Sequence, residues 1–303
     1  MLKYFSFFIL VTLLLACDSL YGQTRNGSGG ATINSIPSVV RNDTCLDKKF
    51  SVVVYLINDS VYTLTNATSS VSAIAAYNLT QCFLKLNATF SVWCISFEHC
   101  KTVIIPNFTY NDWNARRNGM NAIAEYNTIN TICLYVPIKL VTTNQYDIAV
   151  PAYGYDADTL APYKNAIVCA KTALGLSPFF HAVGMFFGLP HTFDEINPGS
   201  PTTPPTPAGI NSKEFVNKSN SLIHGDGFSD TEADPFPITT ATNLPSPSSL
   251  DCASVSVKDA NGEYYTPPLE NYMSHYLPCS CKYSQQQYLA MVHYIMRKRL
   301  YLH

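Results

Sequence analysis

Apolar and polar residues follow one another along this chain in blocks that predict a mixed α/β domain. Residues 50–57 are a β-branched apolar run typical of a buried strand, and apolar residues recur at helical spacing over 71–86. Four more apolar segments predict strands at 90–97, 102–105, 131–136 and 166–169. A strand, a helix and then several strands favour an α/β layer over a helical bundle.

Two more helices are predicted in the second half of the chain. Residues 178–189 are almost wholly apolar, and residues 284–299 carry an apolar face made by Leu289, Val292, Ile295 and Met296. The basic run 297–299 then lies at the negative end of the last helix dipole. Between these helices, residues 197–208 are rich in Pro, Gly, Ser and Thr and predict an exposed loop.

The first 44 residues are expected to precede the folded domain. Lys3 is followed by an apolar run, 4–16, that is too short to span a bilayer and is typical of a secretory signal. Cleavage near Gly22 would free the chain, whereas residues 14–17 also fit a bacterial lipobox that would place a lipid anchor on Cys17. Residues 23–44 are Gly/Ser/Asn-rich and predict a flexible leader. We therefore expect an exported protein, either secreted or a cell-envelope lipoprotein.

Composition narrows the choice of partners and of compartment. The 303 residues are 47% hydrophobic, enough for one large core over 45–303, and the net charge of −2 gives no electrostatic case for nucleic acid. Ten cysteines in an exported chain favour disulfides. Without Cys17 nine remain, so at least one is unpaired or pairs between chains. Eight Asn-x-Ser/Thr sequons, such as 66–68 and 87–89, matter only if the host glycosylates.

The candidate chemistry lies in residues 181–195. His181 and His191 stand ten residues apart, and Gly188 between them can end a helix and turn the chain. A hydrolytic zinc site needs three protein ligands, two of which lie four residues apart on one helix face. Here the fourth residue after His181 is Met185, a thioether that prefers copper(I), and Ala182 replaces the general-base glutamate. On this spacing alone, two ordinary histidines without a metal remain the alternative.

Several motifs in the same order resemble the pappalysin type of metzincin zinc metallopeptidase. They occupy residues 181–193, 225–235, 271–274 and 279–291, and the resemblance extends over about 45–295. It implies an upper lobe, 45–190, with a twisted mixed sheet and helices above an active-site helix. It also implies an irregular lower lobe, 191–303, with a Met-turn and a C-terminal helix. The family uses catalytic zinc, often with structural calcium.

The resemblance assigns family roles to individual residues. His181 and His191 match the first and third zinc ligands, Met185 the second, Ala182 the general base, and Met273 the Met-turn methionine. His275 stands where the family has a tyrosine, and Cys252 and Cys279 match a family disulfide. Calcium candidates are the clustered acids Asp226, Asp230 and Asp234, although exposed turn aspartates are the commoner explanation.

Three departures at three chemical positions predict a pseudoprotease that keeps a peptide-binding cleft and has lost turnover. Its expected partner is an extended peptide added as a strand beside the sheet. One alternative is a zinc endopeptidase with a rebuilt site of His181, His191 and His275, with Met185 as an optional ligand. A second alternative is a copper- or zinc-binding protein with no peptide role.

Overall fold

The computed structural model describes residues 45–58, 70–114, 118–141, 152–193, 213–221, 224–235, 257–274 and 279–303, with side chains from residue 79 onward in the second range. All of them belong to one compact unit, Thr44–His303. Within these ranges no helix has the length and apolarity needed to cross a membrane. The predicted signal and leader, Cys17, the loop at 197–208, Cys252 and His275 lie outside the described residues.

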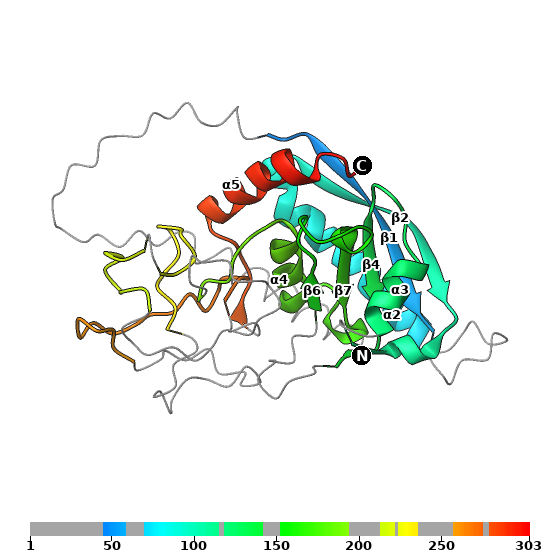
Figure 1. Ribbon diagram of the computed structural model, residues 1–303, viewed down its shortest axis with the longest axis horizontal. Coiled ribbons are helices and arrows are strands. Elements are labelled where there is room, and N and C mark those ends of the chain that lie inside the picture. Colours follow the sequence, from blue (N-terminus) through cyan, green and yellow to red (C-terminus); the bar gives the residue numbers. More distant parts are fainter. Residues whose placement is uncertain are drawn as a thin grey trace, which may run out of the picture. The chain divides into compact units, whose positions relative to one another are not determined.

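A five-stranded mixed sheet organises the unit (Figure 1). Its order is β2 (Ile95–Ile105), β1 (Lys48–Ile57), β4 (Ile132–Val136), β7 (Ala166–Cys169) and β6 (Ala152–Gly154). The first four strands are parallel, and β6 pairs antiparallel with β7 at one edge. A separate parallel pair is formed by β3 (Asp112–Trp113) and β5 (Lys139–Leu140).

Four helices pack around this sheet. They are α2 (Ser70–Phe90), α3 (Asn118–Glu125), α4 (Ser177–Phe186) and α5 (Gln285–Tyr294), which continues as a π-helical turn over Ile295–Arg299. Short 3-10 turns lie at Ser91–Trp93, Phe108–Asn111, Tyr163–Asn165 and Lys171–Ala173. Ser284 begins α5 with a capping box, in which its hydroxyl and the Gln287 side chain each bond the other residue's backbone.

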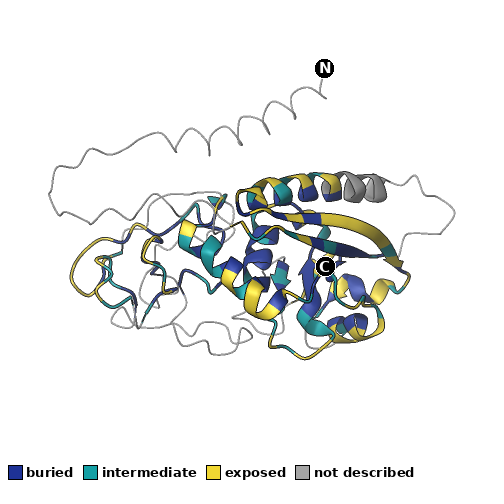
Figure 2. Ribbon diagram, turned by 90° about the horizontal axis from the view of Figure 1, so that it is seen from above, coloured by how far each residue is buried: buried dark blue, intermediate teal, exposed yellow. Residues whose placement is uncertain are grey.

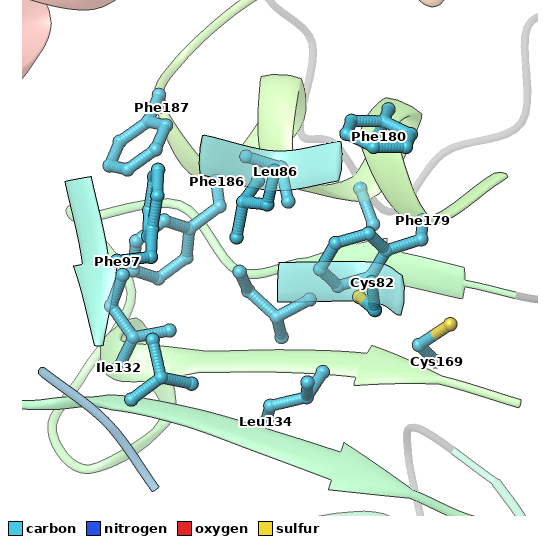
Figure 3. Packing of buried hydrophobic residues seen from close by; sticks show 14 of the residues in the cluster. Cys82, Leu86, Phe97, Ile132, Leu134, Cys169, Phe179, Phe180, Phe186 and Phe187 are labelled. Carbon is cyan, nitrogen blue, oxygen red and sulfur yellow. The ribbon is translucent and has the colours of Figure 1, made fainter. Parts of the chain in front are cut away.

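Alternate residues of β1 enter two different cores, as the period of a strand requires. Val52 and Val54 face a large core shared with α2, α4 and α5, whereas Val53 and Tyr55 face a smaller core with α3 and Trp113. Both faces of the sheet are therefore covered, and Figure 2 shows buried inner strands next to helices that each expose one face, while the edge strand β2 is largely exposed. Figure 3 shows how tightly the phenylalanines of α4 pack in the larger core.

The sequence predicted most of these elements, with one clear error. The strands at 50–57, 131–136 and 166–169 and the helices at 71–86, 178–189 and 284–299 are confirmed to within a few residues. The predicted strand at 102–105 is confirmed as the second half of β2, whereas the predicted strand at 90–97 is wrong at its start, because Phe90 ends α2 and the strand begins only at Ile95. A bulge places Cys100 as an extra residue opposite β1, which keeps this polar edge strand continuous.

One disulfide joins the start of the unit to the turn before β2. Cys45 and Cys94 are bonded with their Cα atoms 5.1 Å apart, a pairing that the spacing did not predict. Cys279 and Cys281 each take part in a disulfide. The predicted Cys252–Cys279 pair stays a prediction, because Cys252 lies outside the described residues. Thiols are present at Cys82, Cys100, Cys133 and Cys169, and of these only Cys100 is exposed.

Candidate functional site

Helix α4 carries the first predicted ligand and is packed on the Met273 turn. Pro178 stands in the first helical turn, where a missing N–H costs nothing, and an unbroken apolar run buries the helix beneath β6 and β7. A Cβ on Gly184 would lie 2.4 Å from the Met273 Sδ. Glycine therefore lets the helix and the turn approach as closely as they do.

The chain leaves α4 through a left-handed glycine, as the sequence predicted. Gly188 has φ +80°, and its N–H donates to the Met185 carbonyl while Leu189 N–H donates to Gly184. A Cβ on Gly188 would also lie 2.3 Å from the Tyr294 ring of α5. This reversal returns the chain toward α4 and places His191 beside His181.

The predicted Met-turn is a defined turn held by side chains. The Asn271 amide oxygen accepts from Met273 N at 2.8 Å, and its Nδ2 donates to Gln287 Oε1 at 2.9 Å. Ser274 N donates back to the Asn271 carbonyl, which closes the turn. Met273 is fully buried. The turn thus links the floor of the site to α5.

His181 and His191 lie side by side above this floor. Their ring centroids are 5.0 Å apart with planes at 19°. His181 is 4% exposed and its Nδ1 lies 2.7 Å from the Tyr272 carbonyl oxygen. Because a carbonyl oxygen only accepts, Nδ1 carries the proton, and in a neutral ring the lone pair is on Nε2. This is the orientation that a metal-binding imidazole usually has.

His191 is positioned by the residues that follow it. Thr192 N donates to the Met273 carbonyl at 3.1 Å, and Thr192 Oγ1 donates to Asp234 Oδ2 at 2.7 Å. The Phe193 ring stacks on His191 at 4.8 Å between centroids. Asp234 is therefore a positioning residue for this imidazole, a role that its clustering with other acids did not indicate.

Ala182 lies in the core, and Met185 packs against it. Ala182 is fully buried, and its carbonyl lies against β6, where a Cβ on Gly154 would approach it to 2.3 Å. Met185 is half-buried and packs against the larger core. A buried methyl group thus stands where the resemblance implies a general base, and a thioether stands where it implies the second ligand.

These donors do not fit a hydrolytic zinc site. Zinc at such a site takes three strong protein ligands and a water, and the described residues offer two imidazoles and one thioether at this place. Across the described ranges, no group of three or more His, Cys, Asp or Glu side chains is arranged to hold a metal. No catalytic step through zinc follows from this arrangement.

The three predicted calcium residues have different hydrogen-bond partners in the structure. Asp230 accepts from Ser284 Oγ at 2.7 Å and from Gln286 N at 2.8 Å, so it caps α5. Asp234 bonds Thr192. Asp226 is buried against a residue that the sequence did not single out, Glu214.

The Asp226 and Glu214 carboxylates form a small buried acidic cluster. Asp226 Oδ1 accepts from Thr231 Oγ1, and Glu214 Oε1 accepts from Lys218 Nζ at 3.0 Å. The other oxygens, Asp226 Oδ2 and Glu214 Oε2, are buried without a described hydrogen-bond partner. Burial raises the pKa of Asp226 to about 7 and also raises the pKa of Glu214.

A pocket of about 240 Å³ opens beside this cluster and away from the histidine pair. Its lining residues are Val216, Lys218, Ser229, Asp230, Thr231, Glu232, Ala233 and Thr266. No histidine lines this pocket. The candidate functional site is therefore placed at the histidine pair beside α4 and the Met273 turn, and not at the pocket. The Glu214 cluster and this pocket were missed because their residues come from separate turns with no shared spacing.

Comparisons with known proteins leave the family open. No protein-family model matches the chain, and no curated protein matches it. Mature mirolysin from Tannerella forsythia, in complex with a cleaved peptide, is similar over 80% of this chain and 89% of its own, at 15% identity and a TM-score of 0.43. A chaperone–substrate complex is similar over 84% of this chain and 35% of its own, at 10% identity and a TM-score of 0.34. Similarities this low carry no conclusion about activity.

Proposed function

We propose that this protein is a metzincin-like pseudoprotease that binds an extended peptide and does not hydrolyse it. The observation that carries the proposal is the pairing of His181 and His191 over the Met273 turn, with Ala182 and Met185 at the positions of the lost chemistry. This packing supports a site of protease type whose base and second ligand have been replaced. Losing a general base alone costs about 10²–10⁴-fold in rate, and losing metal-activated water costs more.

Edge strand β6 supports the peptide-binding half of the proposal. Tyr155 N donates to the Ala166 carbonyl, so residues 153 and 155 bond β7. In an antiparallel pair the intervening residues, here Ala152 and Gly154, direct their N–H and C=O groups away from the partner. Gly154 itself lies against α4, since a Cβ there would come within 2.3 Å of the Ala182 carbonyl oxygen. An extended peptide added there would pass over the histidine pair.

Restoring the two lost residues tests the proposal. Peptide cleavage and metal content are compared in the native protein, Ala182→Glu/Met185→His, and the matched control Ala182→Gln/Met185→His. We expect no cleavage by the native protein and zinc uptake by both double variants. Cleavage is expected only with the glutamate, since glutamine cannot take a proton. Native turnover that a chelator abolishes would reject the pseudoprotease and favour a zinc endopeptidase.

Metal binding without hydrolysis is a second candidate function. The Tyr272 carbonyl holds His181 in the tautomer of a metal ligand, and a thioether, such as that of Met185 one helical turn after His181, suits copper(I) better than zinc. Elemental analysis of the purified native protein, with His275→Ala beside it, tests this candidate. Stoichiometric copper or zinc without peptide affinity favours it, and metal lost in His275→Ala assigns that residue as the third ligand.

The acidic cluster supports structural calcium as part of the same proposal. Calcium binds six to eight oxygens, preferably from carboxylates and carbonyls. Asp226 and Glu214 each keep a buried oxygen without a described partner, and Thr231 adds a hydroxyl beside Asp226. Asp226 and Glu214 would hold the ion, and Asp230 and Asp234 keep their roles in capping α5 and in bonding Thr192.

A further inference from the structure

The Asn-x-Ser/Thr sequons differ in whether the structure leaves room for an N-linked glycan on the asparagine. Of the eight in the sequence, three have every side chain within the described residues: Asn87–Thr89, Asn107–Thr109 and Asn217–Ser219. An attached glycan is bulky and hydrophilic, so its asparagine must point into solvent. This requirement separates the three sequons.

The Asn87 amide is used inside the fold. Its Nδ2 donates to the Phe97 carbonyl at 3.0 Å, and its Oδ1 accepts from Phe97 N at 2.7 Å. These bonds join α2 to the start of β2, and the side chain is half-buried. A sugar on Nδ2 would have to fit between the helix and the strand.

The Asn107 amide is also engaged. Its Oδ1 accepts from both N and Oγ1 of Thr109, at 3.1 and 2.6 Å, and its side chain hydrogen-bonds Tyr110. The residue caps the turn Phe108–Asn111 and is half-buried.

Asn217 is presented quite differently. Both Asn217 and Ser219 are exposed, in a tight turn where Lys218 has φ +62°. Asn217 Oδ1 accepts from Ser219 N at 3.0 Å, which holds the side chain over its own sequon. No hydrogen bond within the described ranges involves its Nδ2, and Ser219 is exposed in the same turn.

We propose that Asn217 is an N-glycosylation site and that Asn87 is not one. The donor is a lipid-linked oligosaccharide pyrophosphate. The Asn217 Nδ2 bonds to C1 of the first sugar, the bond from C1 to the pyrophosphate oxygen breaks, and one amide proton is lost. The lipid pyrophosphate is the leaving group. The proposal requires export through a compartment that holds this donor, in agreement with the secretory signal predicted at residues 1–22.

Expression of the full chain, with its own N-terminus, in a eukaryotic secretory cell line tests the site. Glycopeptides from the medium are mapped by mass spectrometry before and after enzymatic removal of N-glycans. We expect a glycan on Asn217 and none on Asn87. Asn217→Gln and Ser219→Ala should each remove one glycan step on a gel, whereas Ser219→Thr and Asn87→Gln should leave that step in place.

The control variants show whether loss of the glycan follows from loss of the Asn217 sequon itself. Asn217→Gln removes the acceptor, while Ser219→Ala keeps Asn217 and removes only the sequon hydroxyl, so equal loss in both identifies the sequon. An unmodified Asn217 in secreted protein overturns the proposal. A glycan on Asn87, or a chain that stays in the cell without any glycan, overturns it as well.

Discussion

Gly184 is the residue at which α4 and the Met273 turn come into direct contact. Since a Cβ there would lie 2.4 Å from Met273 Sδ and 3.1 Å from the Tyr283 ring, Gly184→Ala must displace one of them. We expect a loss of about 1–2 kcal/mol in the free energy of unfolding, overpacking being partly offset by the better helix propensity of alanine. Urea unfolding measures it.

A double-mutant cycle assigns this cost to the Met273 contact. Met273→Ala alone should lose about 2–5 kcal/mol through the cavity it leaves. In the double variant the new methyl group no longer meets the sulfur, so the combined loss should be smaller than the sum. Strictly additive losses would mean that Gly184 is required for another reason.

The effect of calcium on thermal stability should distinguish the buried Asp226 from Asp230. Calcium at about 100 times its Kd stabilises a one-site protein by about 2.7 kcal/mol, or roughly 5–10 °C in Tm for a domain of this size. We expect that shift in the native protein and its loss in Asp226→Asn. Asp230→Asn should keep it, because Asp230 bonds the start of α5. Thermal unfolding of each variant is measured with calcium and with a chelator. Equal Tm shifts in Asp226→Asn and Asp230→Asn would reject Asp226 as a calcium ligand.

The turn that continues the last helix is tied to α4 by a buried arginine. Arg299 is fully buried, donates to the carbonyls of Lys164, Tyr155 and Phe186, and lies 3.7 Å from the Phe186 ring centroid. Phe186 is the end of α4, so this side chain holds the region where the chain turns toward His191. Burial lowers the pKa of Arg299, which indicates that the carbonyls only partly replace its hydration.

Replacing this arginine should weaken the whole domain. Arg299→Met leaves three carbonyls without their donor, and we expect a loss of about 2–4 kcal/mol in chemical denaturation. Arg297→Met is the matched control, since Arg297 is exposed two residues away and its loss should change little. Similar effects of the two variants would mean that the basic run acts only through its net charge.

At the scale of elements, the hydrophobic pattern predicted the strands and helices that are long and apolar. The strand at 50–57 and the helix at 178–189 were found because nearly every residue in them enters a core. The edge strand β6 was missed because Ala152–Gly154 has too few residues for a period. The basic run at 297–299 was expected to meet the helix dipole, but a sequence cannot show that Arg299 turns inward to distant carbonyls.

The same limit applies to the candidate site. The spacing and Gly188 alone left two ordinary histidines as the alternative, and it was the family resemblance that implied a site of His181 and His191 over the Met273 turn. The structure stacks the two rings because one helix and one turn place them. Residues that meet from distant segments of the chain share no spacing by which a sequence could pair them. Glu214 and Asp226 are brought together by chain folding alone, and the different partners of Asp226, Asp230 and Asp234 could not be predicted for the same reason.

At the scale of the molecule, the Cys45–Cys94 disulfide closes the N-terminal end of the sheet. It spans 49 residues and includes β1 and α2, so reduction should free a large loop. The chain-entropy relation gives about 4 kcal/mol for a loop of this length. We expect Cys45→Ser/Cys94→Ser to lower stability by that order, and the exposed Cys100→Ser to leave it nearly unchanged. Denaturant midpoints for both variants check this, and native stability unaffected by reductant would contradict it.

Peptide binding beside β6 makes a prediction that does not require altering the protein. Strand addition uses every second backbone N–H of the peptide, because alternate residues face the sheet edge. A capped octapeptide selected for binding from a mixed-sequence pool is therefore remade with single N-methyl groups along its length. Affinity measured by calorimetry should fall in an alternating pattern, by about tenfold at each inward-facing position if one hydrogen bond of about 1.4 kcal/mol is lost. Binding governed only by side-chain pockets would show no period of two, and the proposed docking on β6 would then be wrong even if the protein still bound peptides.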